Sequence, residues 1–484
     1  MSSVAAALLA QPDSPPRLYP SPQALDSDYR YWRFRILSAS LVGYAVFYFV
    51  RTNIAVALPE MQKELGYTRE QLGIILSGGV IYGVSKFVNG FLGDRANPRY
   101  FMAIGLILCA LMNVLFGLSS ALVLLGTFWL LNNWFQGMGF PPCARNMGYW
   151  FSPRERGTTF GIWHTGHTAG AALISVMTGY IIVLTGNWRL CFFIPAAIAA
   201  AGAAMLLWRL RDTPGSLGLP PVEIWKREET PRQLAAELRQ PPPPGNAGGA
   251  VALDYESPRG ASYLRVVVEN IFLNPWMWVI SVANLLVYTL RYATLNWGPM
   301  YLQQMKGMST VASAWLHAGN EVAGLVSALL AGIVADRVFR GRAGRVCVIA
   351  MVAMTAALYL FWVTPRGSPW LLALLYLTMG FMIYVPQMLI AAMAMNLGTK
   401  RAAGAAVGLT GIFGYLSTIV SGWGTGLLAD KAGWDAVFRL MIGCAVGTVA
   451  LMALTWNVGA HKDEQHLTSH NPAPGSGAAR SAAR

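Results

Sequence analysis

GFLGDR, residues 90–95, and GIVADR, residues 332–337, are two copies of one short pattern set 332 − 90 = 242 residues apart. Each copy ends a long apolar run. Arg51 and Arg291 stand in two other apolar runs at nearly the same spacing, 291 − 51 = 240 residues. Several matches in one order at one spacing indicate an internal duplication. The sequence therefore predicts two related halves.

Apolar runs long enough to cross a hydrocarbon core of ~30 Å recur along the whole chain. Its 484 residues are 55% hydrophobic and 12% charged, whereas soluble proteins carry about 25% charged residues. The predicted fold class is an all-α membrane protein with twelve transmembrane helices in two pseudo-symmetric six-helix bundles. We expect these helices near residues 34–58, 71–92, 100–118, 121–149, 157–184, 190–209, 272–302, 310–335, 345–363, 369–395, 403–428 and 437–458.

A polar stretch containing WKREE and PPPP separates the two sets of apolar runs and cannot span a membrane. Directly after it, SYLRVVVENIF (residues 262–272) is typical of a short amphipathic helix at the membrane surface. The expected parts are an N-terminal segment (1–33), a first bundle (34–210), a linker (211–270), a second bundle (271–459) and a disordered tail (460–484).

Basic residues gather in alternate loops, as with Arg95 and Arg99 in the first half and Arg340 and Arg342 in the second, while the opposite loops are nearly free of them. This asymmetry predicts a multi-pass protein of the cell inner (plasma) membrane with both termini cytoplasmic. The net charge of +14 is thereby explained by the basic loops that orient the chain in the membrane. The expected macromolecular surrounding is the lipid bilayer, and no nucleic-acid partner is expected.

Charged side chains inside the apolar runs are few and mostly positive: Arg51, Lys86 and Arg291, with His164 and His167 able to add charge when protonated. Each ion near the middle of a spanning helix costs about 2.5–3.5 kcal/mol, so it needs a partner or a ligand. The first half offers no acid in its membrane interior, and the second offers Glu321. Cations without matching acids favour an anionic ligand. Two arginines can present bidentate forks to a phosphate.

Tyrosines accompany these cations. Tyr44, Tyr48 and Arg51 are spaced i, i+4, i+7, so they line one helical stripe. Tyrosine hydroxyls bond phosphate or sugar oxygens while their rings exclude water. The tyrosines predicted for the site are Tyr44, Tyr48, Tyr82, Tyr288, Tyr384 and Tyr415.

Each of these residues also has a simpler interpretation. Arg51 and Arg291 can snorkel to a helix end, and Lys86 can be a structural cation paired with a carbonyl. His164 and His167 can be packed, hydrogen-bonded histidines, and any single tyrosine can serve packing alone.

The acids near these helices suggest a conformational rather than a ligand-binding role. Glu321 either pairs with a cation and holds the resting state or bonds a neighbouring helix. Asp94 and Arg95, with their counterparts Asp336 and Arg337, are predicted to form a charged latch between helix ends at the cytoplasmic face.

Longer segments carry a family resemblance: GYAVFYFVRTN (43–53), WFQGMGFPPCARNM (134–147), RDTPGSLGLPPVE (211–223), VYTLRYATLNWGPMYL (287–302) and AAGAAVGLTGIFGYL (402–416). With the duplicated plan, they resemble the major facilitator superfamily and, within it, the organophosphate:phosphate antiporters. That group includes glycerol-3-phosphate and hexose-6-phosphate transporters and a hexose-phosphate sensor.

The resemblance implies that Arg51 and Arg291 bind the phosphate, and that Lys86, His167 and the predicted tyrosines belong to the same pocket. It also implies exchange of cytoplasmic inorganic phosphate for an external organophosphate by rocking of the two halves, without a cofactor. The Asp and Lys pair of the hexose-6-phosphate transporters is replaced here by Val407 and Thr410, which leaves the preferred organophosphate open.

Three other functional classes are alternatives to an antiporter. A receptor would use the same fold and pocket to sense external sugar phosphate and signal to a membrane kinase. A proton-coupled exporter is disfavoured because the first half lacks a membrane carboxylate. The sequence shows no catalytic triad, phosphate-binding loop or metal-ligand spacing, so we expect no catalytic residue and no metal site, and an enzyme is not expected.

Overall fold

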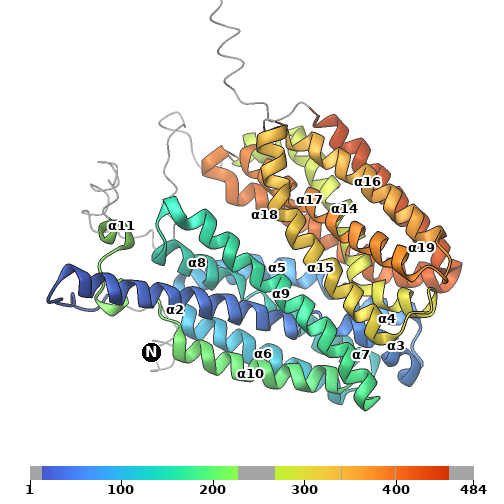
Figure 1. Ribbon diagram of the computed structural model, residues 1–484, viewed down its shortest axis with the longest axis horizontal. Helices are drawn as coiled ribbons and strands as arrows, with labels where there is room; N and C mark the ends of the chain where they lie inside the picture. The colour runs from blue at the N-terminus through green and yellow to red at the C-terminus, as the bar shows by residue number, and fades with distance from the viewer. Residues whose placement is uncertain (1–12, 227–266, 340, 398, 457–484) are drawn as a thin grey trace, which may run out of the picture.

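A computed structural model describes residues 13–226, 267–339, 341–397 and 399–456. Its regular elements within these ranges are helices, and they pack as two bundles, drawn blue to green and yellow to red in Figure 1. The predicted surface helix at 262–272 is described only from residue 267, where a short π-helical turn, η2 (Val268–Phe272), leads into the second bundle. The predicted tail at 460–484 lies outside the described residues.

The first bundle is built from six membrane-crossing units, three of which are interrupted. Its helices are α2 (Pro22–Phe49) and α3 (Ile54–Leu65), α4 (Arg69–Ser77) and α5 (Val80–Arg95), α6 (Pro98–Leu118), α7 (Leu122–Gln136) and α8 (Phe140–Trp150), α9 (Pro153–Thr185), and α10 (Leu190–Arg209). After α10 the chain forms a short turn and α11 (Val222–Trp225).

The second bundle repeats the plan with fewer interruptions. Its helices are α14 (Pro275–Gln304), α15 (Thr310–Ile333), α16 (Ala343–Val363), α17 (Pro369–Leu397), α18 (Thr399–Ile419) and α19 (Thr425–Leu454). The turn η4 (Val420–Gly424) continues α18 into α19, and α19 bends at Gly433, whose φ of 74° is left-handed and therefore suits glycine. This bend separates the eleventh span from the twelfth.

Among the described residues, nine helical stretches are long and apolar enough to cross a membrane. The stretch Ala405–Leu454 holds two spans because of the bend at Gly433. The second and fourth spans are missing from the nine because each is divided into two shorter helices, the second at Gly78 and Gly79 and the fourth at Gly137, Met138 and Gly139. Counted this way, the described chain makes the twelve spans that the sequence predicts.

The first helix begins at Pro22, well before the predicted start near residue 34. The Ser21 side chain accepts a hydrogen bond from the Ala24 amide, and proline suits the first helical position. Residues 22–33 carry several charges, so hydropathy cannot detect this part of the helix. The predicted N-terminal segment is therefore partly an extension of the first span.

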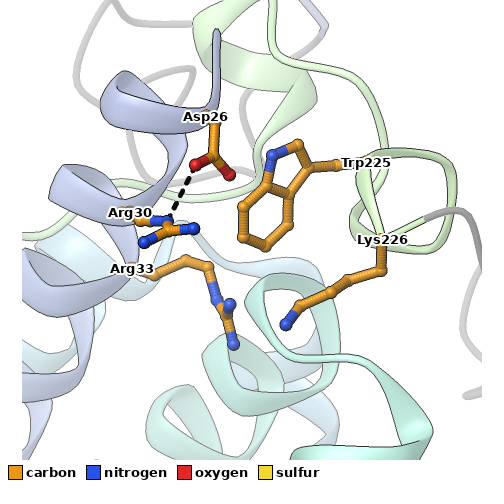
Figure 2. A pocket seen from close by; sticks show the side chains of 5 residues that line it. All are labelled: Asp26, Arg30, Arg33, Trp225 and Lys226. Atoms are coloured by element: carbon orange, nitrogen blue, oxygen red, sulfur yellow. Dashed lines mark ion pairs between the residues drawn. The ribbon is translucent and has the colours of Figure 1, made fainter. Parts of the chain in front are cut away.

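At this end of the molecule, called the terminal end below, a cavity of about 470 Å³ lies between α2 and α11. Asp26, Arg30, Arg33, Trp225 and Lys226 line it (Figure 2). Beside it, Glu155 at the start of α9 pairs with Arg33 and, at 3.3 Å, with Lys226. Burial alone would raise the pKa of Glu155, but the hydrogen bond and charge of Arg33 hold that pKa below its usual value. The ion pairs tie the helix extension to the linker.

The two bundles share a core at the end away from the terminal end, called the opposite end below. One apolar cluster includes Leu72 and Leu76 of α4 and continues through Trp297 and most of the second bundle. A separate cluster fills the terminal end of the first bundle alone. At the opposite end the backbones also touch, because a Cβ on Gly73 would lie 2.5 Å from the Gly422 carbonyl oxygen. The bundles therefore join at the opposite end and diverge towards the terminal end (Figure 1).

Candidate functional site

Arg51 lies in a break of the first span. The helix α2 ends at Phe49 and α3 begins at Ile54, so Arg51 does not stand on the continuous stripe that its spacing from Tyr44 and Tyr48 predicts. The guanidinium carbon nevertheless lies 5.2 Å from the Tyr48 ring centre and 3.9 Å from that of Tyr82. Cation–π contacts of this kind hold the guanidinium against aromatic faces. The side chain is half-buried.

Arg291 lies within the continuous helix α14 and is held by side chains from two other helices. Its Nη2 donates a hydrogen bond of 2.7 Å to the Tyr384 hydroxyl of α17 and lies 3.9 Å from Glu321 Oε2 of α15. The Tyr384 hydroxyl in turn donates to Glu321 Oε2 at 2.7 Å. The Glu321 side chain is 3% exposed and that of Arg291 12%. Glu321 is thus a buried counter-ion of Arg291 and is also bonded to the neighbouring helix α17; that it holds the resting state stays a prediction.

Tyrosine rings connect the surroundings of the two arginines. Tyr82, which stacks on Arg51, meets the ring of Tyr415 from α18 edge-on, with 5.0 Å between ring centres. Tyr415 lies 6.1 Å from Tyr288 and 6.4 Å from Tyr292, both on α14 beside Arg291. Four of the described aromatic rings thus form a bridge from one bundle to the other. Tyr292 was not among the predicted residues, although its position next to Arg291 and four residues after Tyr288 is a detectable signal.

The remaining predicted residues form a wall on the first bundle. Tyr44 stacks on Trp163 at 4.7 Å, and Tyr48 lies 5.2 Å from the ring of His167. His167 is 5% exposed, and its Nδ1 is hydrogen-bonded to the His164 carbonyl. Lys86 places its Nζ 4.1 Å from the centre of the Phe140 ring.

This wall adjoins the arginine of its own bundle, because the Arg51 guanidinium carbon lies 5.2 Å from the Tyr48 ring centre and the Tyr48 ring lies beside His167. The structure therefore gathers the predicted binding residues into one polar and aromatic region; that they bind substrate stays a prediction.

The predicted latch residues are described only in part. The side chains of Asp94, Arg95 and Asp336 lie outside the described part of the structure, and Arg337 is exposed at the end of the short π-helical turn after α15.

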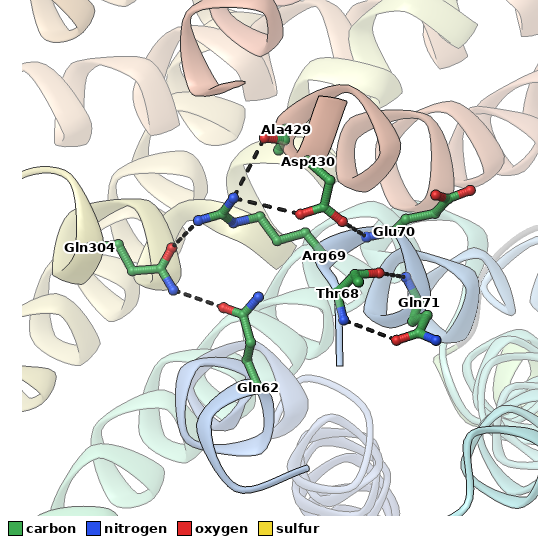
Figure 3. Close-up of polar contacts among 8 residues, drawn as sticks. All are labelled: Gln62, Thr68, Arg69, Glu70, Gln71, Gln304, Ala429 and Asp430. Carbon is green, nitrogen blue, oxygen red and sulfur yellow. Dashed lines mark hydrogen bonds and ion pairs between the residues drawn. The ribbon is translucent and has the colours of Figure 1, made fainter. Parts of the chain in front are cut away.

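A polar network at the opposite end, which sequence analysis missed, ties the bundles together (Figure 3). Arg69 of α4 lies 3.6 Å from Asp430 of α19 and donates a 3.1 Å hydrogen bond to Gln304 of α14. The Glu70 amide donates to Asp430 at 2.6 Å, and Gln304 donates to Gln62 of α3 at 2.9 Å. The partners are hundreds of residues apart in the chain, so no local pattern could reveal the network.

Asp430→Asn is expected to loosen the opposite end, because it removes the charge that Arg69 faces. A partly exposed pair contributes about 0.2–1 kcal/mol, so the open population should rise about 1.5–5-fold. Labelling of a Leu76→Cys variant by a maleimide reports this opening, since Leu76 is buried in the shared core.

The matched control is Asp435→Asn. Asp435 accepts a 2.8 Å hydrogen bond from Trp362 within the second bundle. Its replacement should therefore leave the rate of Leu76→Cys labelling unchanged. Equal labelling of the Asp430→Asn variant and its parent would show that the ion pair does not hold the bundles together.

Comparison of the sequence with known proteins identifies the family of this chain. Residues 40–422 match the family model of the Major Facilitator Superfamily. A probable hexose phosphate transport protein of Chlamydia trachomatis is 38% identical over 93% of this chain and 96% of its own length. The glycerol-3-phosphate transporter of Bacillus subtilis is 34% identical over 92% of this chain and 96% of its own. The membrane sensor protein UhpC of Escherichia coli is 35% identical over 89% and 93%.

Solved structures agree on the fold. A bacterial homologue of the human lysosomal transporter Spinster, in an inward-facing and occupied conformation, superposes with a TM-score of 0.66 at 16% identity, covering 87% of this chain and 96% of that one. The curated relatives are named transporters and a sensor, in keeping with the prediction that the chain is not an enzyme. The chain is therefore a multi-pass membrane protein of the major facilitator superfamily and belongs, within it, to the family of the organophosphate transporters and their sensor relative.

Proposed function

We propose that the protein exchanges an organophosphate, such as glycerol-3-phosphate or a sugar phosphate, for inorganic phosphate by alternating access. The observation that carries the proposal is that each bundle supplies one arginine, Arg51 or Arg291, to the same aromatic region. They come from related places in the two bundles, and the tyrosine bridge connects their surroundings. Repeated halves around a shared midplane site are the plan of alternating-access carriers. The names of the relatives support phosphate-bearing substrates.

The charges around Arg291 suggest how substrate binding moves the carrier. Glu321 and the Tyr384 hydroxyl occupy one side of the guanidinium. A phosphate bound between the bundles competes with Glu321 for the same donors, and charge-assisted hydrogen bonds offset its loss of hydration. The same anion also draws Arg51 from the other bundle. Binding therefore favours an arrangement in which the bundles approach each other around the ligand.

Orientation follows from the loop charges. We take the terminal end to be cytoplasmic in the inner membrane, since the basic loops lie there. The shared core and the Arg69–Asp430 network then close the carrier on the external side, and the arginine pair is reached from the cytoplasm. Arg291 has Glu321 as a counter-ion, but Arg51 has no ion pair among its described contacts. Reorientation with an unpaired cation inside the membrane is unfavourable, so movement across the cycle requires a bound anion. This requirement makes the transport an exchange.

The test is uptake of labelled phosphate into proteoliposomes preloaded with unlabelled phosphate. Glycerol-3-phosphate, glucose-6-phosphate and 3-phosphoglycerate are added outside as competitors. The expected result is rapid phosphate exchange that one organophosphate inhibits, with little uptake into vesicles that contain no counter-anion. Rapid net uptake into vesicles lacking a counter-anion would contradict the exchange mechanism.

A receptor for external hexose phosphate, signalling to a membrane sensor kinase, is the second candidate, and the 35% identity to the membrane sensor protein UhpC favours it. A receptor would bind sugar phosphate with the same arginines but show no exchange. The same proteoliposome experiment, combined with a binding measurement on the purified protein, separates the two functions.

A further inference from the structure

The break in the first span frees backbone carbonyls deep inside the first bundle. In an intact helix the Phe47 carbonyl would accept a hydrogen bond from the Arg51 amide, but that amide bonds to the Tyr48 carbonyl instead. The Gln136 side chain of α7 donates to the freed Phe47 carbonyl at 3.0 Å. Carbonyl groups freed in a bilayer need such replacement donors.

A second carbonyl at the break, that of Val50, receives two side-chain donors. Asn132 of α7 donates to it at 2.9 Å and Asn113 of α6 at 3.1 Å. Asn113 also accepts a 3.0 Å hydrogen bond from Asn53, and Asn53 donates at 2.9 Å to the carbonyl of Cys191 in α10. Three helices thus hold the segment that carries Arg51.

The four residues Asn53, Asn113, Asn132 and Gln136 form what we call the amide clamp. All four are buried, with exposed fractions of 0–2%. Burying an amide is unfavourable unless it is hydrogen-bonded, so four of them at one place form a specific, costly arrangement. Asn132 and Gln136 are one helical turn apart on α7 and face the same way. Both bonds lie on the chain leading into Arg51: Asn132 bonds the carbonyl of Val50, directly before it, and Gln136 that of Phe47, four positions before it.

The second bundle fixes its arginine differently. Arg291 stands on the continuous helix α14, whose own backbone bonds set its direction, and its guanidinium is held by Tyr384 and Glu321. Arg51 stands on a turn, where two soft dihedral angles per residue would otherwise leave its direction open. We infer that the amide clamp positions Arg51 for the phosphate group, with Gln136 and Asn132 as positioning residues. This inference rests on the proposed function.

The test is a double-mutant cycle between Gln136 and Arg51 on the full-length purified protein. Gln136→Met keeps the size of the side chain and removes the donor. We expect it to weaken binding of inorganic phosphate about tenfold, the effect of one lost buried hydrogen bond. In an Arg51→Lys background the same change should cost less than about twofold, because coupled residues are not additive. Equal losses in both backgrounds would overturn the inference.

The matched control is Asn133→Leu on the same helix. Asn133 is buried like Asn132, but its side chain donates at 2.9 Å to the Trp129 carbonyl of its own helix. If the clamp had a purely structural role, Gln136→Met and Asn133→Leu would lower thermal stability alike, and neither would change phosphate affinity. Should Gln136→Met not fold, Asn132→Leu serves as the second variant, since it removes the side-chain donor from Asn132 to the Val50 carbonyl and adds no charge.

A second readout is independent of transport. The rate at which phenylglyoxal modifies Arg51, followed by peptide mass spectrometry, reports the position of its guanidinium. Gln136→Met should change this rate several-fold while the rate for Arg291 stays constant. An unchanged Arg51 rate overturns the positioning role even in a protein that exchanges phosphate. Absence of phosphate binding by the parent, together with a changed Arg51 rate, overturns the proposed function and leaves the clamp standing.

Discussion

Arg291→Lys is expected to lower phosphate exchange at least about a hundredfold, and Arg51→Lys to have an effect of similar size. A lysine at 291 retains the charge but cannot bond the Tyr384 hydroxyl and present a fork to phosphate at once. A lysine at 51 loses the planar group that lies 3.9 Å over Tyr82. Both losses act on the bound anion, so binding and exchange should fall together.

The measurement is initial exchange rate in proteoliposomes containing equal amounts of each variant, with phosphate affinity measured on the purified proteins. Arg366→Lys is the control, since Arg366 is exposed and bonds only backbone carbonyls, at Met305 and Gln304, among its described hydrogen bonds. Exchange close to that of the parent in either site variant would exclude that arginine from the phosphate site.

Asp212→Ala is expected to destabilise the first bundle by about 3–5 kcal/mol, because it strands a buried cation. Asp212 follows α10 and pairs with Arg145 of α8 at 3.0 Å, and their side chains are 0% and 8% exposed. Arg145 also donates to the Ala96 carbonyl at the end of α5, and Trp150 donates to the Asp212 carbonyl at 2.8 Å. The pair therefore fastens three spans at the terminal end.

The unfolding temperature of the purified variant, monitored by size-exclusion chromatography after heating, measures this loss of stability. Asp26→Ala is the matched control, since its pair with Arg30 at 2.9 Å is exposed and local and should contribute at most about 0.5 kcal/mol. An Arg145→Met and Asp212→Leu double variant should recover part of the stability, as it removes both charges. An unfolding temperature of Asp212→Ala equal to that of the parent would show that the ion pair does not stabilise the first bundle.

The duplicated pattern at residues 90–95 and 332–337 was enough to predict the two bundles, because apolar runs of spanning length and a repeat leave few other folds. The arginine pair was detectable for a similar reason: a charge inside an apolar run stands out whatever the surrounding structure. The helix extension from Pro22 was not detectable, since hydropathy does not register a charged helix that leaves the membrane.

Other features depend on contacts between distant parts of the chain. In the first span the sequence marks the break only by the polar residues Arg51, Thr52 and Asn53, which an unbroken helix could also carry. The break becomes visible only through the amides of α6 and α7 that bond its freed carbonyls. Likewise, Arg69 and Asp430 are ordinary loop charges in the sequence and become partners only when the bundles pack.

The shared core at the opposite end has a thermal consequence. For the carrier to open there, Leu72, Leu76 and their neighbours must leave the apolar side chains of the second bundle and meet water. Exposure of apolar surface raises the heat capacity. The equilibrium between the two orientations should therefore follow a curved rather than a straight van't Hoff plot, so the direction in which the resting carrier faces becomes a function of growth temperature.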